Sequence, residues 1–415
     1  MSETAISHRK PEGLPDVIRH YIDGEYVDSI DGDTFDVLDP VTNESYIQAA
    51  SGKSADIDRA VAAAKAAFER GEWSQALPRA RSRVLHRIAD IMESRGDQLA
   101  EMECFDTGLP IKQAKGQAAR AAENFRFFAD LIVAQHDDAF KVPGRQANYV
   151  NRKPIGVAGL ITPWNTPFML ESWKLAPALA TGNSVVLKPA EFTPLSASLW
   201  PEIVEEASLP TGVFNMVHGF GEEGYAGDPL VKHPDVPLIS FTGESRTGQI
   251  IFGNAAPYLK GLSMELGGKS PAVVFADADL DTAIDATIFG VFSLNGERCT
   301  AGSRILVQRD VYDEFVERYA KQAANVKVGL PSDPTTEVGA LVHPEHYEKV
   351  MSYVEIGKGE ARLVAGGGRP EEFPEGNFVQ PTVFADVAPD ARIFQEEILG
   401  PVVAITPFDT DEEAL

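Results

Sequence analysis

The run Gly156-Val157-Ala158-Gly159-Leu160-Ile161 begins a stretch in which short apolar segments alternate with helical ones. Three more such runs follow, at residues 184–187, 213–217 and 238–241. Apolar runs bounded by Gly and Pro are typical of buried parallel strands joined by crossover helices. The pattern therefore predicts a doubly wound α/β sheet, in which ligands bind at the carboxyl ends of the strands.

Smaller elements are predicted upstream of this stretch. Residues 21–27 and 34–38 alternate like the two strands of a hairpin, with residues 30–33 as its turn. Ser54 is expected to cap a helix, and Gly71 is expected to end it. We expect these elements to contribute to the core rather than to a functional site.

A second α/β unit is predicted to start near Leu262. Its expected strands are residues 272–275, 304–307 and 402–405. Between residues 138 and 153, a Pro-Gly turn joins two polar alternating stretches, and this pattern indicates an exposed ribbon.

Composition excludes several classes of partner. The 415 residues are 44% hydrophobic and 24% charged, and 37 basic against 62 acidic residues give a formal net charge of -25. Such a balance repels phosphate backbones and anionic membranes, so we expect no nucleic acid and no membrane partner. No apolar run is long enough to cross a bilayer and the N-terminus lacks a signal peptide, so we expect a cytoplasmic protein. We assign no metal site.

One of only two cysteines, Cys299, lies in the polar segment Asn-Gly-Glu-Arg-Cys-Thr-Ala-Gly. A free cysteine is usually a small buried hydrophobe, and Cys104 fits that description. Cys299 differs because Gly296 and Gly302 let the backbone approach a ligand closely, and the adjacent cation Arg298 can favour the thiolate. We therefore interpret Cys104 as a core residue and Cys299 as a nucleophile.

Six motifs follow one another along the chain. They are Thr162-Pro163-Trp164-Asn165-Thr166-Pro167, Leu187-Lys188-Pro189-Ala190-Glu191, Phe241-Thr242-Gly243, Met264-Glu265-Leu266-Gly267-Gly268-Lys269-Ser270-Pro271, Asn295-Gly296-Glu297-Arg298-Cys299 and Glu396-Glu397-Ile398-Leu399-Gly400-Pro401. Covering roughly residues 20–410, this set resembles the NAD(P)-dependent aldehyde dehydrogenase superfamily. The resemblance implies a Rossmann-type doubly wound parallel sheet, a second α/β catalytic domain and a small β-hairpin oligomerisation arm, with a homodimer or homotetramer as the assembly.

The resemblance also implies a domain division. It consists of a flexible N-terminal arm at 1–18, a dinucleotide-binding domain at 19–137 and 155–261, an oligomerisation hairpin at 138–154, and a catalytic domain at 262–415. Members of this family continue well past the last residue here. We therefore expect a catalytic domain that is truncated at its C-terminus and lacks one wall of the substrate funnel.

Aldehyde oxidation needs a nucleophile, because an aldehyde has no leaving group. A thiolate suits this task, since the thioester left after hydride loss is readily hydrolysed. Cys299 is the expected nucleophile, and the Asn165 side chain with the Cys299 backbone N–H are the expected oxyanion donors. Glu265 fits a base that activates water, and its presence favours a free acid over a coenzyme A ester. Lys174 matches a lysine implied to help proton movement, although a solvated helix lysine explains it nearly as well.

Two residues after a predicted strand point to the cofactor. Lys188 and Glu191 place a cation and a carboxylate where a ribose can be held, and the carboxylate favours NAD over NADP because it repels a 2′-phosphate. Residues 219–224 satisfy the dinucleotide fingerprint, but they come too late in the sheet to form the pyrophosphate loop. Glu244 stands where many family members have serine, and its carboxylate is expected to repel a pyrophosphate.

The remaining cofactor contacts are implied by the resemblance alone. Gly221 and Gly227 are expected near the adenine, Gly243 and Gly248 at the helix that faces the pyrophosphate, and Glu397 at the nicotinamide ribose. The other expected contacts are Ile161, Thr162, Pro163, Trp164, Phe241, Thr242 and Leu266.

The substrate is indicated by residues around Arg120. Residues 106–110 and 125–128 most resemble the branch that acts on hydroxymuconic-type semialdehydes in aromatic catabolism, where an arginine at the place of Arg120 binds a substrate carboxylate. A surface helix arginine is the equal alternative. A betaine-type or general aliphatic aldehyde also remains open.

Two other function classes remain open. One is a non-catalytic protein with the same fold. The other is a cysteine hydrolase, which we rank last because no histidine lies in a recognisable base motif.

Overall fold

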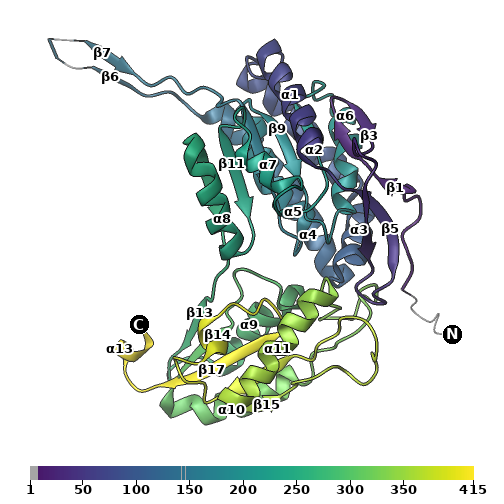
Figure 1. Cartoon of the computed structure of the whole chain (residues 1–415). Coiled ribbons are helices and arrows are strands. Elements are labelled where there is room, and N and C mark those ends of the chain that lie inside the picture. The colour runs from purple at the N-terminus through teal and green to yellow at the C-terminus, as the bar shows by residue number, and fades with distance from the viewer. Residues whose placement is uncertain (1–7, 142, 145) are drawn as a thin grey trace.

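The computed structural model describes residues 8–141, 143–144 and 146–415, and it contains two principal sheets (Figure 1). The first has the order β12-β11-β8-β9-β10-β2-β3. Its strands are β2 (His20–Ile22), β3 (Glu25–Val27), β8 (Val157–Ile161), β9 (Ser184–Lys188), β10 (Phe214–Met216), β11 (Leu238–Thr242) and β12 (Gly261–Glu265). The strands from β12 to β10 are parallel, so the predicted doubly wound sheet is confirmed.

Helices cover both faces of this sheet, because alternate residues of each central strand point to opposite sides. In β8, Ala158 and Leu160 pack in one apolar cluster, while Val157 and Ile161 pack in another. The first cluster includes α2 (Pro78–Ser94), α4 (Ile111–Ala134), α5 (Pro167–Ala180) and α6 (Trp200–Glu206). The second includes α1 (Ser54–Arg70), α7 (Gly227–Lys232) and α8 (Ser245–Ala255). Cys104 is buried in α3 (Gly96–Thr107), as predicted.

The second sheet has the order β13-β14-β17-β16-β15 and forms the lower part of Figure 1. Its strands are β13 (Pro271–Val274), β14 (Arg304–Gln308), β15 (Arg362–Ala365), β16 (Thr382–Ala385) and β17 (Val402–Phe408). Helices α9 (Leu280–Phe292) and α10 (Arg309–Ala323) share a core with one face, and α11 (Pro344–Glu360) and α12 (Arg392–Gln395) share a core with the other. The short helix α13 (Asp411–Ala414) follows β17.

The predicted start of the second unit near Leu262 is wrong in one respect. That residue lies inside β12, which pairs with β11 and forms the edge of the first sheet. The second sheet begins at Pro271, so the chain crosses between the sheets over the short segment 266–270. The apolar character of β12 does not reveal which sheet receives it.

The predicted N-terminal hairpin is also wrong. Strand β2 pairs with β3, whereas β4 (Thr34–Leu38) pairs with β5 (Ser45–Ala50). Strand β1 (Val17–Ile18) lies parallel to β5, and His8 stacks on Phe105, so the segment 8–18 is attached to the fold at both of its ends. Residues 1–7 of the predicted arm lie outside the described residues.

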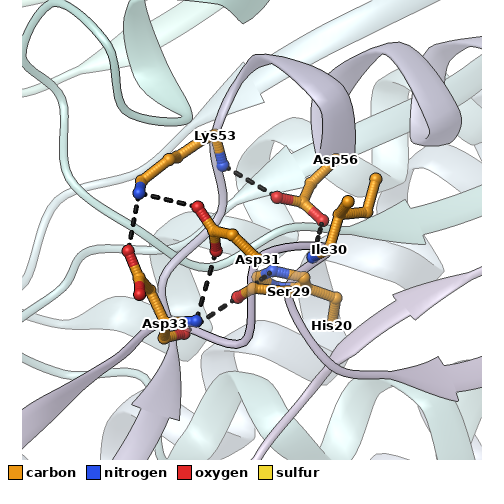
Figure 2. Close-up of polar contacts among 7 residues, drawn as sticks. All are labelled: His20, Ser29, Ile30, Asp31, Asp33, Lys53 and Asp56. Carbon is orange, nitrogen blue, oxygen red and sulfur yellow. Dashed lines mark hydrogen bonds and ion pairs between the residues drawn. The ribbon is translucent and has the colours of Figure 1, made fainter.

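Helix α1 begins at Ser54, but Ser54 is not its cap. The Asp56 carboxylate accepts the backbone N–H of Lys53 at 2.9 Å and that of Ile30 at 3.0 Å (Figure 2). The Lys53 ammonium also lies within 2.7 Å of Asp31 and 2.6 Å of Asp33. The Asp56 carboxylate therefore binds the N–H of the residue before the helix and also fastens the helix start to the loop at Ile30. Gly71 ends the helix in the left-handed conformation, as predicted.

Strands β6 (Ala139–Lys141) and β7 (Ala147–Tyr149) form the antiparallel ribbon predicted between residues 138 and 153. The ribbon extends away from both sheets (Figure 1). Phe140 is 60% exposed and Tyr149 is 77% exposed. Its apolar side chains therefore find no cover within the described part of this chain.

Candidate active site

The predicted cofactor residues gather at the carboxyl edge of the first sheet. Ile161 is paired with Lys188 on one side and Phe241 on the other, and Thr242 is paired with Glu265. Strand order reverses at β8, because β9 and β10 extend to one side and β11 and β12 to the other. Such a switch point is where open α/β sheets bind ligands.

A pocket of about 150 Å³ lies where this edge meets the cysteine loop. Residues from both sheets line it. Those predicted from sequence are Pro163, Trp164, Asn165, Thr242, Gly243, Glu244, Leu266, Cys299 and Glu397. The structure thus brings the proposed nucleophile and oxyanion donor to the same pocket as the sheet edge.

The loop before Cys299 has an unusual backbone. Leu294, Asn295 and Gly296 all have positive φ, at 53°, 58° and 72°. A Cβ on Gly296 would collide with the carbonyl group of Gly400. Gly296 therefore permits close packing against the protein's own backbone, and not against a ligand as predicted. The Asn295 amide donates to the carbonyls of Gly108 and Ala340, which fixes the loop.

Cys299 is half-buried, and its pKa is raised above the ordinary thiol value. Burial is the main cause, and the carboxylates of Glu397 and Glu265 add to it. Arg298 lowers the pKa, as predicted, but its effect is the smaller one. This environment therefore favours the neutral thiol over the thiolate.

Asn165 is buried beside Cys299 in the pocket. Its Nδ2 donates to the Glu297 carbonyl at 2.7 Å, which leaves its second amide N–H without a partner among the described residues. The buried Oδ1 has no hydrogen-bond partner there either. An uncommitted N–H beside a thiol has the chemistry of an oxyanion donor.

Lys174 is not a solvated helix lysine. Its side chain is 5% exposed, and its Nζ donates to Ser240 Oγ at 3.0 Å. Burial lowers its pKa to about 8, and the nearby Glu265 carboxylate partly opposes that shift. Glu265 itself is exposed at the end of β12. The Glu265 carboxylate therefore influences the Lys174 amine through its charge, whereas the hydrogen bond of that amine goes to Ser240.

The chemistry of a dinucleotide fits this edge. Lys188 Nζ lies 3.0 Å from Glu191 Oε2, and the Glu191 side chain is 28% exposed, so the pair offers both a cation and a carboxylate to hydroxyl groups. Glu397 Oε1 accepts the Gly268 N–H at 3.0 Å. A Cβ at Gly267 would collide with Glu397 Oε2, so only glycine leaves room for this carboxylate.

Other predicted cofactor residues lie around the start of α8. A Cβ at Gly248 would lie 2.6 Å from Leu266, so this glycine lets α8 pack against Leu266. Glu244 is exposed at the first turn and makes no capping hydrogen bond. Gly227 and Gly221 touch each other, with 2.8 Å between a Cβ on Gly227 and the Gly221 Cα. Thr162 Oγ1 is buried without a partner among the described residues.

Arg120 lies apart from this pocket. It lines a second pocket of about 670 Å³ together with Arg298, Phe289 and Phe292. Its Nη1 donates to Gln117 Oε1 at 3.4 Å. Arg120 is therefore neither in a salt bridge of the described residues nor beside Cys299 itself.

Sequence reasoning missed part of the thiol pocket. His346 and Lys349 of α11 line it, and no motif surrounds them in the sequence. His346 Nε2 bonds the Leu399 carbonyl at 2.7 Å, and burial lowers its pKa to about 4. In the described structure no hydrogen bond joins it to Cys299, so it does not form the thiol–imidazole pair that a cysteine hydrolase needs. Only its proximity in space to the cysteine loop could have signalled it.

The site thus combines a thiol, a buried amide and a carboxylate at the switch point of a doubly wound sheet, where open α/β folds bind ligands. The family model of the aldehyde dehydrogenase family matches residues 26–415, and the chain belongs to that family. It is therefore an aldehyde dehydrogenase.

Its relatives are similar over most of their length. The chain is 45% identical over 405 residues to 5-carboxymethyl-2-hydroxymuconate semialdehyde dehydrogenase of Escherichia coli, covering 96% of this chain and 85% of that protein. The crystal structure of HpcC from Thermus thermophilus is 51% identical with a TM-score of 0.93, covering 96% and 78%. An NAD+ complex of aldehyde dehydrogenase from Bacillus cereus is 40% identical with a TM-score of 0.92, covering 95% and 80%.

None of the helices in the described ranges has both the length and the apolar character that a bilayer crossing requires.

Proposed function

We propose that this aldehyde dehydrogenase oxidises an aldehyde to the carboxylic acid with NAD, through a covalent intermediate on Cys299. The observation that carries the proposal is the shared pocket of Cys299, Asn165 and Glu397 at the switch point of the sheet. Cys299 gives up its proton to water, the thiolate sulfur adds to the carbonyl carbon, and the C=O π electrons move to the oxygen, which becomes an oxyanion. The free N–H of Asn165 and the Cys299 backbone N–H stabilise that charge, each by about 2.7–4 kcal/mol in comparable sites.

When bound, the cofactor supplies the acceptor for the hydride that leaves the tetrahedral carbon. Lys188, Glu191 and Glu397 would hold its two riboses, since they offer carboxylates and a cation at the sheet edge. The Glu191 carboxylate favours NAD, because it would repel a 2′-phosphate.

Release of the acid requires water to attack the thioester. Glu265 lies at the end of β12 and is exposed, so it can take a proton from water. Lys174, with its lowered pKa, would pass protons between Glu265 and Ser240. This arrangement supports a free acid as the product.

The substrate that we propose is a carboxylated semialdehyde of aromatic catabolism. Arg120 supports it, because it faces a pocket and no carboxylate of the described residues pairs with it. The name of the Escherichia coli relative, a hydroxymuconate semialdehyde dehydrogenase, also supports it.

We also propose that the ribbon of β6 and β7, within residues 138–154, serves subunit association. Its exposed Phe140 and Tyr149 support this assignment, since a lone two-stranded ribbon is only marginally stable in water.

The experiment that tests the proposed function is NADH formation with a panel of aldehydes, with NAD and NADP as alternative cofactors. We expect activity that is abolished in Cys299→Ser and retained in Cys104→Ser. Absence of NADH with every aldehyde would instead support a non-catalytic protein of this fold.

A further inference from the structure

A second pocket lies beside the cysteine loop and has a lining distinct from that of the thiol pocket. It has a volume of about 670 Å³ and is formed by α4, α9 and the residues before Cys299. Phe289 and Phe292 give it an apolar wall. Arg298 lines this pocket, whereas its neighbour Cys299 lines the other one. The peptide that joins these two residues therefore separates a cation from a thiol.

The two arginines of this pocket have no carboxylate partner within the described residues. Arg298 Nη1 donates to Ser293 Oγ at 2.7 Å, and Arg120 Nη1 donates to Gln117 Oε1 at 3.4 Å. Arginines elsewhere in this acidic chain do pair with carboxylates, as Arg126 does with Asp90 at 2.9 Å. The guanidinium groups of the pocket are thus left with neutral partners.

The other charged groups of the pocket do not neutralise them. Asp285 accepts the Gln322 amide at 2.6 Å, and Glu337 accepts the Lys327 N–H at 2.9 Å. Lys112 adds a third cation. The pocket is therefore lined by three cations against two carboxylates, neither of which pairs with an arginine, so an excess of positive charge remains.

Arg298 is also the more deeply placed of the two arginines. It is half-buried, and its guanidinium lies 5.8 Å from the centre of the Phe289 ring. Its pKa is lowered, first by burial and then by the charge of Arg120. Two cations that repel each other in a partly buried space would both be stabilised by an anion between them.

We propose that Arg298 is a specificity-determining residue, which together with Arg120 binds the carboxylate of an aldehyde substrate that bears an anionic group at its far end. The inference rests on the proposed function, because it takes Cys299 as the site of attack. It assigns to Arg298 a binding role that differs from activation of the neighbouring thiol. The phenyl walls suit an extended hydrocarbon between the aldehyde and the carboxylate.

The test compares adipic semialdehyde with hexanal, which has the same chain length without the charge. For Arg298→Gln we expect KM for adipic semialdehyde to rise by about tenfold or more, as expected for loss of a charge-assisted hydrogen bond. KM for hexanal and kcat for both aldehydes should stay within about twofold. Arg298→Lys should lie in between, since it keeps the charge but loses the fork. Lys115→Gln is the matched control, because Lys115 lies on the same helix, pairs with Asp97 and does not line this pocket, and it should leave both KM values unchanged.

A second measurement does not depend on turnover. The affinity for adipate, measured by calorimetry, should fall by about tenfold or more in Arg298→Gln and stay unchanged in Lys115→Gln. If the unmodified protein forms no NADH but binds adipate through Arg298, the proposed function fails and the carboxylate site stands. Equal losses with hexanal and adipic semialdehyde, or adipate affinity that is unchanged in Arg298→Gln, would overturn the inference.

Discussion

The Asn165 side-chain amide is tied by a 2.7 Å hydrogen bond to the carbonyl of Glu297, two residues before the thiol. This bond joins the loop after β8 to the cysteine loop, and Asn165 and Cys299 line the same pocket. The Asn165 amide therefore uses one N–H for a structural hydrogen bond, and its other N–H remains available as a donor.

Asn165→Ala should lower kcat by about 10²–10³-fold, because it removes one of two oxyanion donors. Steady-state kinetics check the value. Asn165→Asp keeps the size but not the donor, so it should be equally slow. Wild-type kcat in Asn165→Asp would exclude the donor role, and a thermal melt would show whether the lost contact to Glu297 unfolds the protein.

Glu265→Gln should separate hydride transfer from hydrolysis. The thioester forms normally, but water is no longer activated, so steady-state kcat should fall by about 10²-fold or more. Rapid mixing should then show a burst of one NADH per active site. Ser263 lies two residues earlier on the same face of β12, and Ser263→Ala should behave like the unmodified enzyme. If the variant were slow and showed no burst, Glu265 would act at or before hydride transfer rather than in hydrolysis.

Glu397→Gln should make Cys299 reactive at lower pH. The Glu397 carboxylate raises the pKa of the thiol, so its removal should shift the midpoint of iodoacetamide alkylation to lower pH. The adjacent Glu396 is held by Arg392 and serves as the control. If Glu396→Gln gave the same shift, the effect would not come from the pocket.

Lys174→Met should change how stability depends on pH. The Lys174 pKa is about 8 in the folded chain and 10.5 as a free side chain, so below pH 8 the buried charge destabilises the fold by on the order of 3 kcal/mol. That cost disappears between pH 8 and 10.5, where the unfolded chain holds a proton that the folded chain lacks. Urea unfolding should therefore show the variant as the more stable protein below pH 8, with the gap closing at higher pH. A gap that is constant with pH, or one that also occurs in the exposed Lys321→Met, would contradict this account.

Glu191→Gln should improve the use of NADP. Loss of the carboxylate beside Lys188 removes a repulsion toward a 2′-phosphate, so kcat/KM for NADP relative to NAD should rise by about tenfold. Initial rates with both cofactors measure the ratio. Glu222→Gln, in the glycine-rich stretch 219–224, should leave the ratio unchanged. If Glu222→Gln changed the ratio, residues 219–224 would again be a candidate for the loop that binds the pyrophosphate.

The central strands could be predicted from sequence, because residues such as Val157 and Leu187 belong to continuous apolar runs that only a sheet buried on both faces accommodates. The N-terminal strands could not. β2 takes its neighbour from β10 and β5 takes its neighbour from β1, and such pairings depend on contacts far along the chain.

The site shows the same division. Motifs placed Asn165 and Cys299, which do share a pocket, because each lies in a local pattern that the family repeats. Lys174 was ambiguous, since an almost wholly buried helix has no polar face from which to judge burial. The position of His346 and the pocket that Arg298 lines can be found only from the folded structure. Neither residue lies in a sequence pattern that indicates which groups surround it.

The crossing of the chain between β12 and β13 takes only residues 266–270, and it contains Gly267 and Gly268. Glu265 stands just before this joint, while the sulfur that it would serve comes from beyond it. The rate of turnover therefore depends on how accurately the two sheets are aligned. A substitution within residues 266–270 can abolish activity while both sheets remain folded.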